Sequence, residues 1–242
     1  MCQTVRPRDA YSMTNTATFR RSAAAVGLVT ASIITAVSTV LAPELPSEYA
    51  DRLGAMAAGG TSATVSAVAF TLAQLPLLAG ILGIGHLLRR SAPRLSNLGT
   101  TLAVVGIFGH SVVGGVMLVQ LELAQDVPNR EAHAAVIAGL ESGPIGPFMG
   151  MGLIGTVLGL LLLSIGVFRA GLGPRWVGPT LWAFLVVEFA GSAVSGWAAH
   201  LAVVLYGAAL FALALTIARS PESVWTVMAD EQPSTELVAG RS

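Results

Sequence analysis

The sequence predicts an all-α polytopic transmembrane helical bundle with six spans and both termini in the cytoplasm. Three observations lead to this fold class. Of the 242 residues, 54% are hydrophobic and only 11% charged, and long apolar runs recur along the chain. Arginines are concentrated in every second segment between these runs. Because a typical soluble domain has about 25% charged residues, a lipid bilayer is the expected environment.

The spans follow from the length of the apolar runs. A helix needs about 20 mainly apolar residues to cross the roughly 30 Å hydrocarbon core. The runs of this length are 23–42, 64–88, 98–120, 148–168, 177–196 and 198–218. The last two form one block too long for a single span. Trp176 and Trp197 lie about 21 residues apart, which fits one interface at each end of the fifth span.

Arginines indicate the orientation, because short cytoplasmic loops retain positive charge. All 13 basic residues are arginine. One side of the predicted spans holds eleven of them, at positions 6, 8, 20, 21, 89, 90, 94, 169, 175, 219 and 241. Only Arg52 and Arg130 fall on the other side. We therefore expect both termini in the cytoplasm, with the protein in the cell (plasma) membrane.

The predicted organisation has three parts. Residues 1–22 form a flexible cytoplasmic segment, residues 23–218 the six-helix transmembrane domain, and residues 219–242 a polar, largely disordered cytoplasmic tail. The first span also resembles a signal peptide, with an arginine pair, an apolar run and "VLA" before Pro43. Its apolar run exceeds the 7 to 15 residues usual in a signal peptide, which favours a retained helix.

The two larger outer loops are each predicted to hold a short helix. Ser47 is expected to cap a helix that begins near Glu48, and Asn129 a helix that ends before Gly143. These loops contain a set of ionisable groups: Glu44, Glu48, Asp51, Glu131, His133 and Glu141. A metal or cationic ligand is one interpretation, but without a metal-binding spacing a solvated polar face is favoured.

The stretch "GLLLLSIGVFRAGLGPRWVGPTLW", residues 159–182, consists of a glycine-rich helix that ends in Arg, a Gly-Pro-Arg-Trp turn and the start of another helix. It resembles a pattern of uncharacterised multi-pass integral membrane proteins of actinobacteria. The resemblance implies an all-helical integral membrane protein and supplies no reaction, ligand or catalytic residue.

Three strongly polar side chains are predicted to lie near the bilayer midplane. At about 1.5 Å per residue from the cytoplasmic ends, Gln74, His110 and Glu188 all fall roughly 16 to 21 Å deep. Ionisable groups at such depth usually face the bundle interior. Pro76, close to Gln74, is expected to bend the second span.

Small residues indicate which way His110 points. Gly106, His110 and Gly114 share one helix face at four-residue spacing, and Gly155 and Gly159 form a similar pair on the fourth span. Such stripes allow helices to approach closely. His110 is therefore expected to face protein, and the fourth span is a plausible partner.

Two functional hypotheses follow. In the first, the protein is a structural or partner-binding membrane component without enzymatic activity, and a protonated Glu188 joins helices through Gln74 or a serine. In the alternative, Glu188 and His110 form the site of a small proton-coupled transporter or carrier, with Gln74 assisting. Hydrolase and ATPase motifs are absent from the sequence.

No cofactor is expected. A haem would need two histidines at similar depth, whereas His86, His110 and His200 are predicted at levels roughly 7 Å or more apart. The expected partners are the lipid bilayer and a membrane protein or second copy of this chain. Zero formal net charge gives no support for a nucleic-acid partner.

Overall fold

A computed structural model describes residues 7–191 and 195–226, and this part of the chain is helical and contains no strand. The α-helices are α1 (Pro7–Leu41), α2 (Tyr49–Leu88), α3 (Pro93–Gln125), α4 (Arg130–Ser142), α5 (Gly146–Ala170), α6 (Val177–Val186) and α7 (Trp197–Ala218). Short helical turns are η1 (Val127–Asn129), the π-helical η2 (Val187–Gly191) and η3 (Glu222–Val224). The all-α prediction is confirmed for the described residues.

Five helices are long and apolar enough to cross a membrane. These segments are Thr16–Leu41, Tyr49–Leu88, Pro93–Gln125, Gly146–Ala170 and Trp197–Ala218. Their outer faces expose large apolar side chains, such as Leu75 at 70% and Val204 at 64% exposure. Exposed apolar surface on this scale fits contact with lipid rather than water, so the helical bundle is that of a membrane protein.

The predicted fifth span, 177–196, is described in part. Its described helix is Val177–Gly191, made of the ten residues of α6 and the five of η2, and 192–194 lie outside the described residues. Five of the six predicted spans have a counterpart among the described residues that is long and apolar enough to cross a membrane. The bracketing of the fifth span by Trp176 and Trp197 stays a prediction.

The two ends of the chain also differ from expectation. Helix α1 begins at Pro7, so residues 7–22, predicted to be flexible, belong to a helix. After α7 the chain forms η3, and Trp225 packs into the bundle with 2% of its surface exposed. Most of the predicted disordered tail, 227–242, lies outside the described residues.

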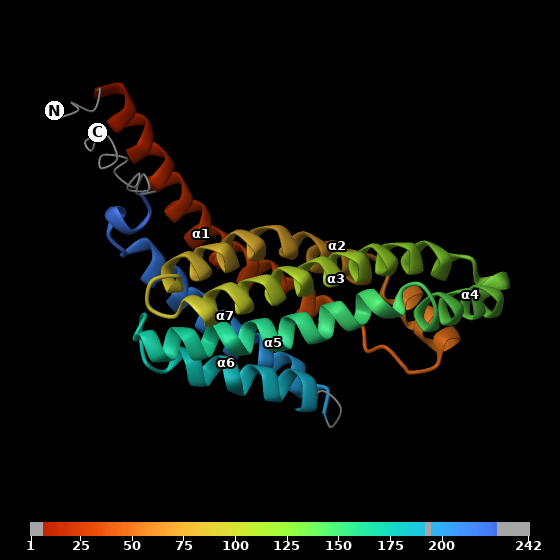
Figure 1. Ribbon diagram of the computed structural model, residues 1–242. Coiled ribbons are helices and arrows are strands. Elements are labelled where there is room, and N and C mark those ends of the chain that lie inside the picture. Colours follow the sequence, from red (N-terminus) through yellow and green to blue (C-terminus); the bar gives the residue numbers. More distant parts are fainter. Residues whose placement is uncertain (1–6, 192–194, 227–242) are drawn as a thin grey trace, which may run out of the picture.

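The long helices α1, α2, α3 and α5 run along the bundle, while α6 and α7 lie at one side of it (Figure 1). Helix α4 packs against α2, α3 and α5 at the far end. There α2 changes direction at Gly60, its only residue with non-helical backbone angles (φ 50°, ψ −125°). Glycine tolerates this positive φ. Pro76 lies within the helical part of α2, so the bend predicted there stays a prediction.

Both predicted outer helices are present, but their predicted caps are wrong. The first is the start of α2, where Glu48 rather than Ser47 occupies the N-cap position, without a side-chain cap bond. The second is α4, which ends before Gly143 as predicted. Its N-cap residue, Asn129, donates its side-chain amide to Asp126 (3.0 Å) instead of accepting from the helix.

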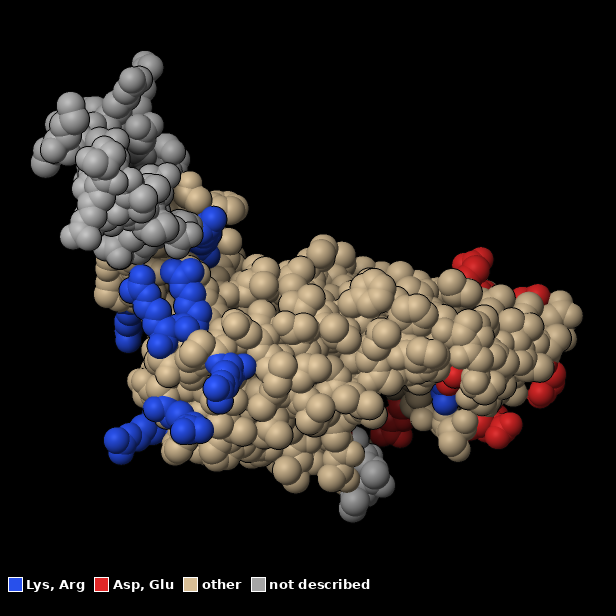
Figure 2. All heavy atoms as spheres, in the orientation of Figure 1, with Lys and Arg blue, Asp and Glu red and all other residues tan. Residues whose placement is uncertain are grey.

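Charged residues gather at opposite ends of the molecule. In Figure 2 arginines surround the end where α2 meets α3 and α5 meets α6, whereas acidic residues cover the end that contains α4. The surface between them in this view is uncharged. An uncharged band between two charged ends is the pattern expected of a bundle that crosses a bilayer.

Helices α3 and α5 form the most extensive helix pair, and glycines make their close approach possible. A Cβ atom on Gly106 would lie 2.5 Å from the backbone nitrogen of Thr156, and one on Gly155 would lie 2.6 Å from that of Gly106. The predicted contact between the two small-residue stripes is confirmed for Gly106 and Gly155, whereas Gly114 packs against Thr71 of α2. Gly109, outside the predicted stripe, makes an even closer approach, 2.3 Å from the nitrogen of Gly152.

Candidate functional site

A cavity of about 160 Å³ lies where the helical segments α1, α2, α3, α5, α6–η2 and α7 converge. It brings together all three polar residues singled out from the sequence, Gln74, His110 and Glu188. The complete lining is Thr35, Thr39, Phe70, Gln74, Leu77, His110, Thr156, Leu160, Phe184, Glu188, Phe189, Val203 and Tyr206. A cavity of similar volume, about 150 Å³, holds a benzene molecule.

Gln74 contributes an acceptor without a partner. Its Nε2 donates to the backbone oxygen of Phe70, one turn earlier on α2 (3.0 Å). Only the nitrogen of the amide can make this bond, because a backbone oxygen accepts and does not donate. The other atom, Oε1, is buried and has no hydrogen-bond partner, in a side chain that is 7% exposed. A buried unsatisfied carbonyl costs about 1–3 kcal/mol.

His110 is half-buried between α2 and α5. Its ring meets that of Phe70 edge to face, with 5.6 Å between centroids and 87° between planes. On the α5 side, a Cβ atom added to Gly152 would lie 3.4 Å from Nδ1. The small residue on α5 thus leaves room for the imidazole, and His110 faces protein as predicted.

Glu188 lies in the π-helical turn η2 and lines the cavity. A π-turn inserts an extra residue into a helix, redirects the side chains that follow, and occurs frequently at functional sites. The side chain of Glu188 is half-buried. The sequence pattern predicts a regular helix here and gives no signal for the π-turn.

The predicted direct pairings are not formed. Among the described residues, no ion pair joins Glu188 to His110. No hydrogen bond joins Gln74 to Glu188 among the described residues; Gln74 Nε2 donates to Phe70, and its Oε1 has no partner. Ser192, the serine four residues after Glu188, lies outside the described residues. The polar groups therefore surround a space instead of closing on one another.

Sequence reasoning missed the aromatic and hydroxyl parts of this cavity. Phe184 and Tyr206 stack obliquely, with 4.7 Å between ring centroids, and form one wall. Thr35 and Thr39 of α1 also line the cavity. At 1.5 Å per residue, Thr35 lies about 20 Å from the arginine pair of α1. Gln74 was identified by the same count of depth in the membrane, so Thr35 could also have been found from the sequence.

The histidines considered for haem lie in three different environments. His86 stacks on Trp225 with 4.7 Å between ring centroids, and its Nε2 lies 2.8 Å from the backbone oxygen of Val224. His200 is exposed beside Trp197. Within the described residues, no three His, Cys, Asp or Glu side chains are grouped as metal ligands.

The outer end contains a second polar cluster, centred on Glu141. Its Oε1 accepts from Arg52 (3.1 Å) and Gln120 (3.3 Å), and its Oε2 accepts from the Tyr49 hydroxyl (3.1 Å). The Arg52 guanidinium also lies 4.7 Å from the centre of the Tyr49 ring. This part of the predicted solvated face is an interhelical junction that ties α2, α3 and α4 together.

A separate ionic contact lies at the start of α4. Asp126 Oδ2 accepts from Asn129 and lies 3.0 Å from Nε2 of His133. The hydrogen bond from Asn129, followed by that from His133, lowers the pKa of the Asp126 carboxyl below its ordinary value. These three residues stabilise the turn between α3 and α4.

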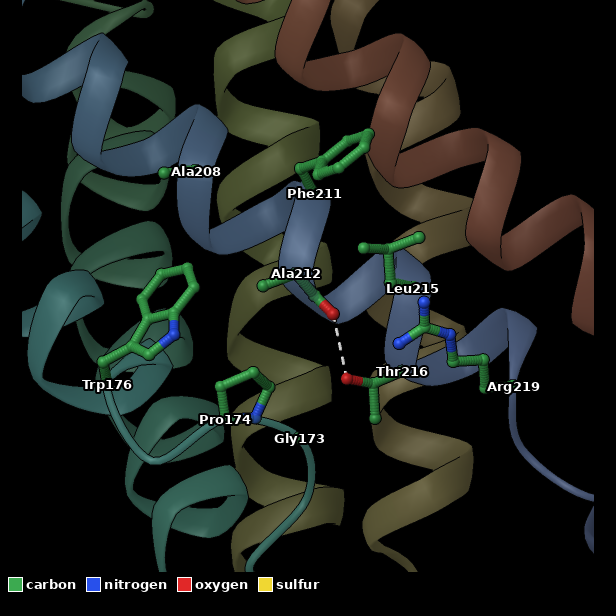
Figure 3. A pocket seen from close by; sticks show the side chains of 9 residues that line it. All are labelled: Gly173, Pro174, Trp176, Ala208, Phe211, Ala212, Leu215, Thr216 and Arg219. Carbon is green, nitrogen blue, oxygen red and sulfur yellow. Dashed lines mark hydrogen bonds between the residues drawn. The ribbon is translucent and has the colours of Figure 1, made fainter.

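A larger cavity of about 560 Å³ lies at the arginine-rich end, between α7 and the turn that joins α5 to α6 (Figure 3). Trp176, Pro174 and Phe211 contribute apolar surface, and Arg219 lies at its edge. The Thr216 hydroxyl already donates to the backbone of Ala212 (2.9 Å). Because it offers few groups able to select a polar solute, the smaller cavity is the better candidate.

Comparisons with known proteins supply no further assignment. No family model, curated protein or solved structure matches this chain.

Proposed function

We propose that the protein is a small proton-coupled membrane carrier whose site is the cavity around Gln74, His110 and Glu188. The observation that carries this proposal is the buried Oε1 of Gln74, which has no partner, in a side chain that lines a cavity together with two titratable side chains. A hydrogen-bond donor in the cavity would satisfy this oxygen, so a bound solute offsets its burial cost.

The helix that holds Glu188 also supports a carrier. Broken membrane helices often line transport sites, because their irregular backbone is tolerated where it borders a cavity. The α6–η2 segment contains a π-turn, and Glu188 lies in it. Motion at this segment would change access to Glu188 without disturbing the closely packed α3–α5 pair.

The proposed topology has six membrane segments, α6–η2 included, with both termini in the cytoplasm of a plasma-membrane protein. The concentration of arginines at one end of the bundle supports this orientation. The proposal includes no enzymatic activity.

A structural or partner-binding role is the second candidate. The glycine-mediated contact between α3 and α5 favours it, since such contacts stabilise helical bundles independently of transport. In that case the cavity residues would affect stability alone.

The test uses purified full-length protein in proteoliposomes that contain a pH-sensitive dye. A pH gradient is imposed and small cationic, neutral and anionic solutes of about six non-hydrogen atoms are added in turn, a size set by the cavity volume. We expect at least one solute to drive proton flux, and Glu188→Gln to abolish it. The control Glu122→Gln, on an exposed position of α3, should retain the flux.

Absence of flux with every solute would contradict the carrier proposal, as would full flux in Glu188→Gln. If no solute drives flux and Glu188→Gln lowers thermal stability, the structural role is supported instead.

A further inference from the structure

The chemistry of the cavity wall indicates which solutes it would select. Its polar groups are mostly acceptors or groups that can accept: the Gln74 carbonyl, the Glu188 carboxyl and the hydroxyls of three threonines. Among the described residues that line it, none is arginine or lysine. A bound anion would meet no permanent positive charge here, whereas a cation would meet a carboxylate and a free carbonyl.

Aromatic rings complete this selection. Phe70, Phe184, Phe189 and Tyr206 all line the cavity. The faces of aromatic rings carry negative partial charge and attract ammonium groups, an interaction worth about 2 kcal/mol when the cation has lost its water. Aromatic side chains also bury the carbon atoms of an organic solute. An inorganic cation would not use this apolar surface.

We propose that the cavity binds a small organic ammonium ion of about six non-hydrogen atoms, with its N–H group directed at Gln74 Oε1 and its charge facing Glu188. This inference rests on the proposed carrier function and names its substrate class. A proton and the ammonium ion compete for the carboxyl of Glu188. When the cation enters, the proton leaves, so that one positive charge replaces another and the exchange is electrically balanced.

Other titratable groups facing Glu188 contribute to its pH dependence. They are His110 from α3 and Tyr206 from α7. The lining residues of α1, α2, α5 and α6 are uncharged: threonines, glutamine, leucines and phenylalanines. Protonation of either Glu188 or His110 disfavours a cation in the cavity, by neutralising the carboxylate or by charge repulsion, so binding should weaken as the pH falls.

The experiment measures ligand-induced thermal stabilisation of the detergent-purified full chain by tryptophan fluorescence. The probe is piperidinium, a six-membered ring with a charged N–H donor. Tetrahydropyran has the same ring size but neither charge nor donor, and phenol has a donor without charge. Piperidinium should raise the unfolding midpoint by several degrees at saturation, and its apparent affinity should fall as the pH is lowered.

Two variants identify the groups responsible. Glu188→Gln should weaken the affinity for piperidinium by about tenfold or more, since it removes the negative charge that faces the cation. Gln74→Leu should weaken it by about tenfold, since it removes one hydrogen-bond acceptor. The control Glu122→Gln should bind as the unmodified protein does. If Glu188→Gln fails to fold, the Gln74→Leu comparison still decides whether the cavity is the site.

Equal stabilisation by tetrahydropyran or phenol would overturn the ammonium assignment, as would unchanged piperidinium affinity in both variants. Piperidinium binding without proton flux in proteoliposomes would refute the carrier function and leave the cation site intact. Flux driven by neutral solutes alone would support the carrier function and overturn the ammonium assignment.

Discussion

Replacing Gly109 by alanine tests whether the close α3–α5 contact stabilises the bundle. A Cβ atom at this position would lie 2.3 Å from the nitrogen of Gly152 and 2.5 Å from the oxygen of Phe148. Both are backbone atoms of α5, so no side-chain rotation relieves the overlap. Reaching an ordinary contact of 3.4 Å requires the two helices to separate by about 1 Å.

This separation has an energetic cost that can be set against the gain from alanine. Overpacking a tight interface destabilises a protein by about 1–3 kcal/mol. Alanine in place of glycine inside a helix contributes about 0.5–1 kcal/mol in the other direction. We therefore expect Gly109→Ala to lower the free energy of unfolding by about 1–2 kcal/mol.

The measurement is an SDS titration of the detergent-solubilised protein followed by tryptophan fluorescence. Gly115→Ala on α3 and Gly150→Ala on α5 are matched controls, because no atom lies within 4 Å of a Cβ at either position. These controls should be neutral or slightly more stable than the unmodified chain. If Gly109→Ala unfolds at the same SDS fraction as Gly115→Ala, glycine at position 109 is not what allows the helices to pack.

Three further predictions concern the ends of the bundle. Glu141→Gln should lower the free energy of unfolding by about 1–3 kcal/mol in the same titration, because the charged acceptor for Arg52 is lost; an unchanged value would contradict the role of the junction. Trp225→Ala should cost about 3 kcal/mol, since Trp225 is 2% exposed, whereas Trp197→Ala, at an 80% exposed position, should change little. Equal effects of the two tryptophan variants would count against docking of the C-terminal segment. The folded-state pKa of Asp126 is depressed, so its stabilising contribution is present above the ordinary carboxyl value of 3.8 and disappears as the pH falls through the folded-state pKa. Thermal unfolding should therefore distinguish Asp126→Asn from the unmodified protein near neutral pH and not in strong acid; a difference independent of pH would refute this reasoning.

Much of the fold could be predicted because lipid imposes a simple rule on sequence. Apolar runs had to match membrane thickness, so five spans were located close to their observed positions. Depth counting brought Gln74, His110 and Glu188 to one level, and they line one cavity. Glycine spacing also identified the α3–α5 contact, since only small residues permit it.

The remaining features depend on contacts between segments far apart in the chain. The π-turn at Val187–Gly191 has no periodic signal, because most of the residues around it are apolar. The caps were misassigned because the Asn129 side chain bonds to Asp126, a competition that local preferences do not resolve. Trp225 was assigned to the tail because a single aromatic residue in a polar stretch does not reveal the site on α2 that receives it.

The docking of the C-terminal segment links the last part of the chain to the first. Arg21 on α1 donates to the backbone oxygen of Ser220 (3.1 Å), and Thr18 donates to Glu222. Helix α1 also packs against α7. Because domains are synthesised from the N-terminus, α1 enters the membrane long before these partners exist. Completion of the bundle must therefore wait for synthesis of the last helix, and truncation just after α7 would leave the first helix without part of its final contact surface.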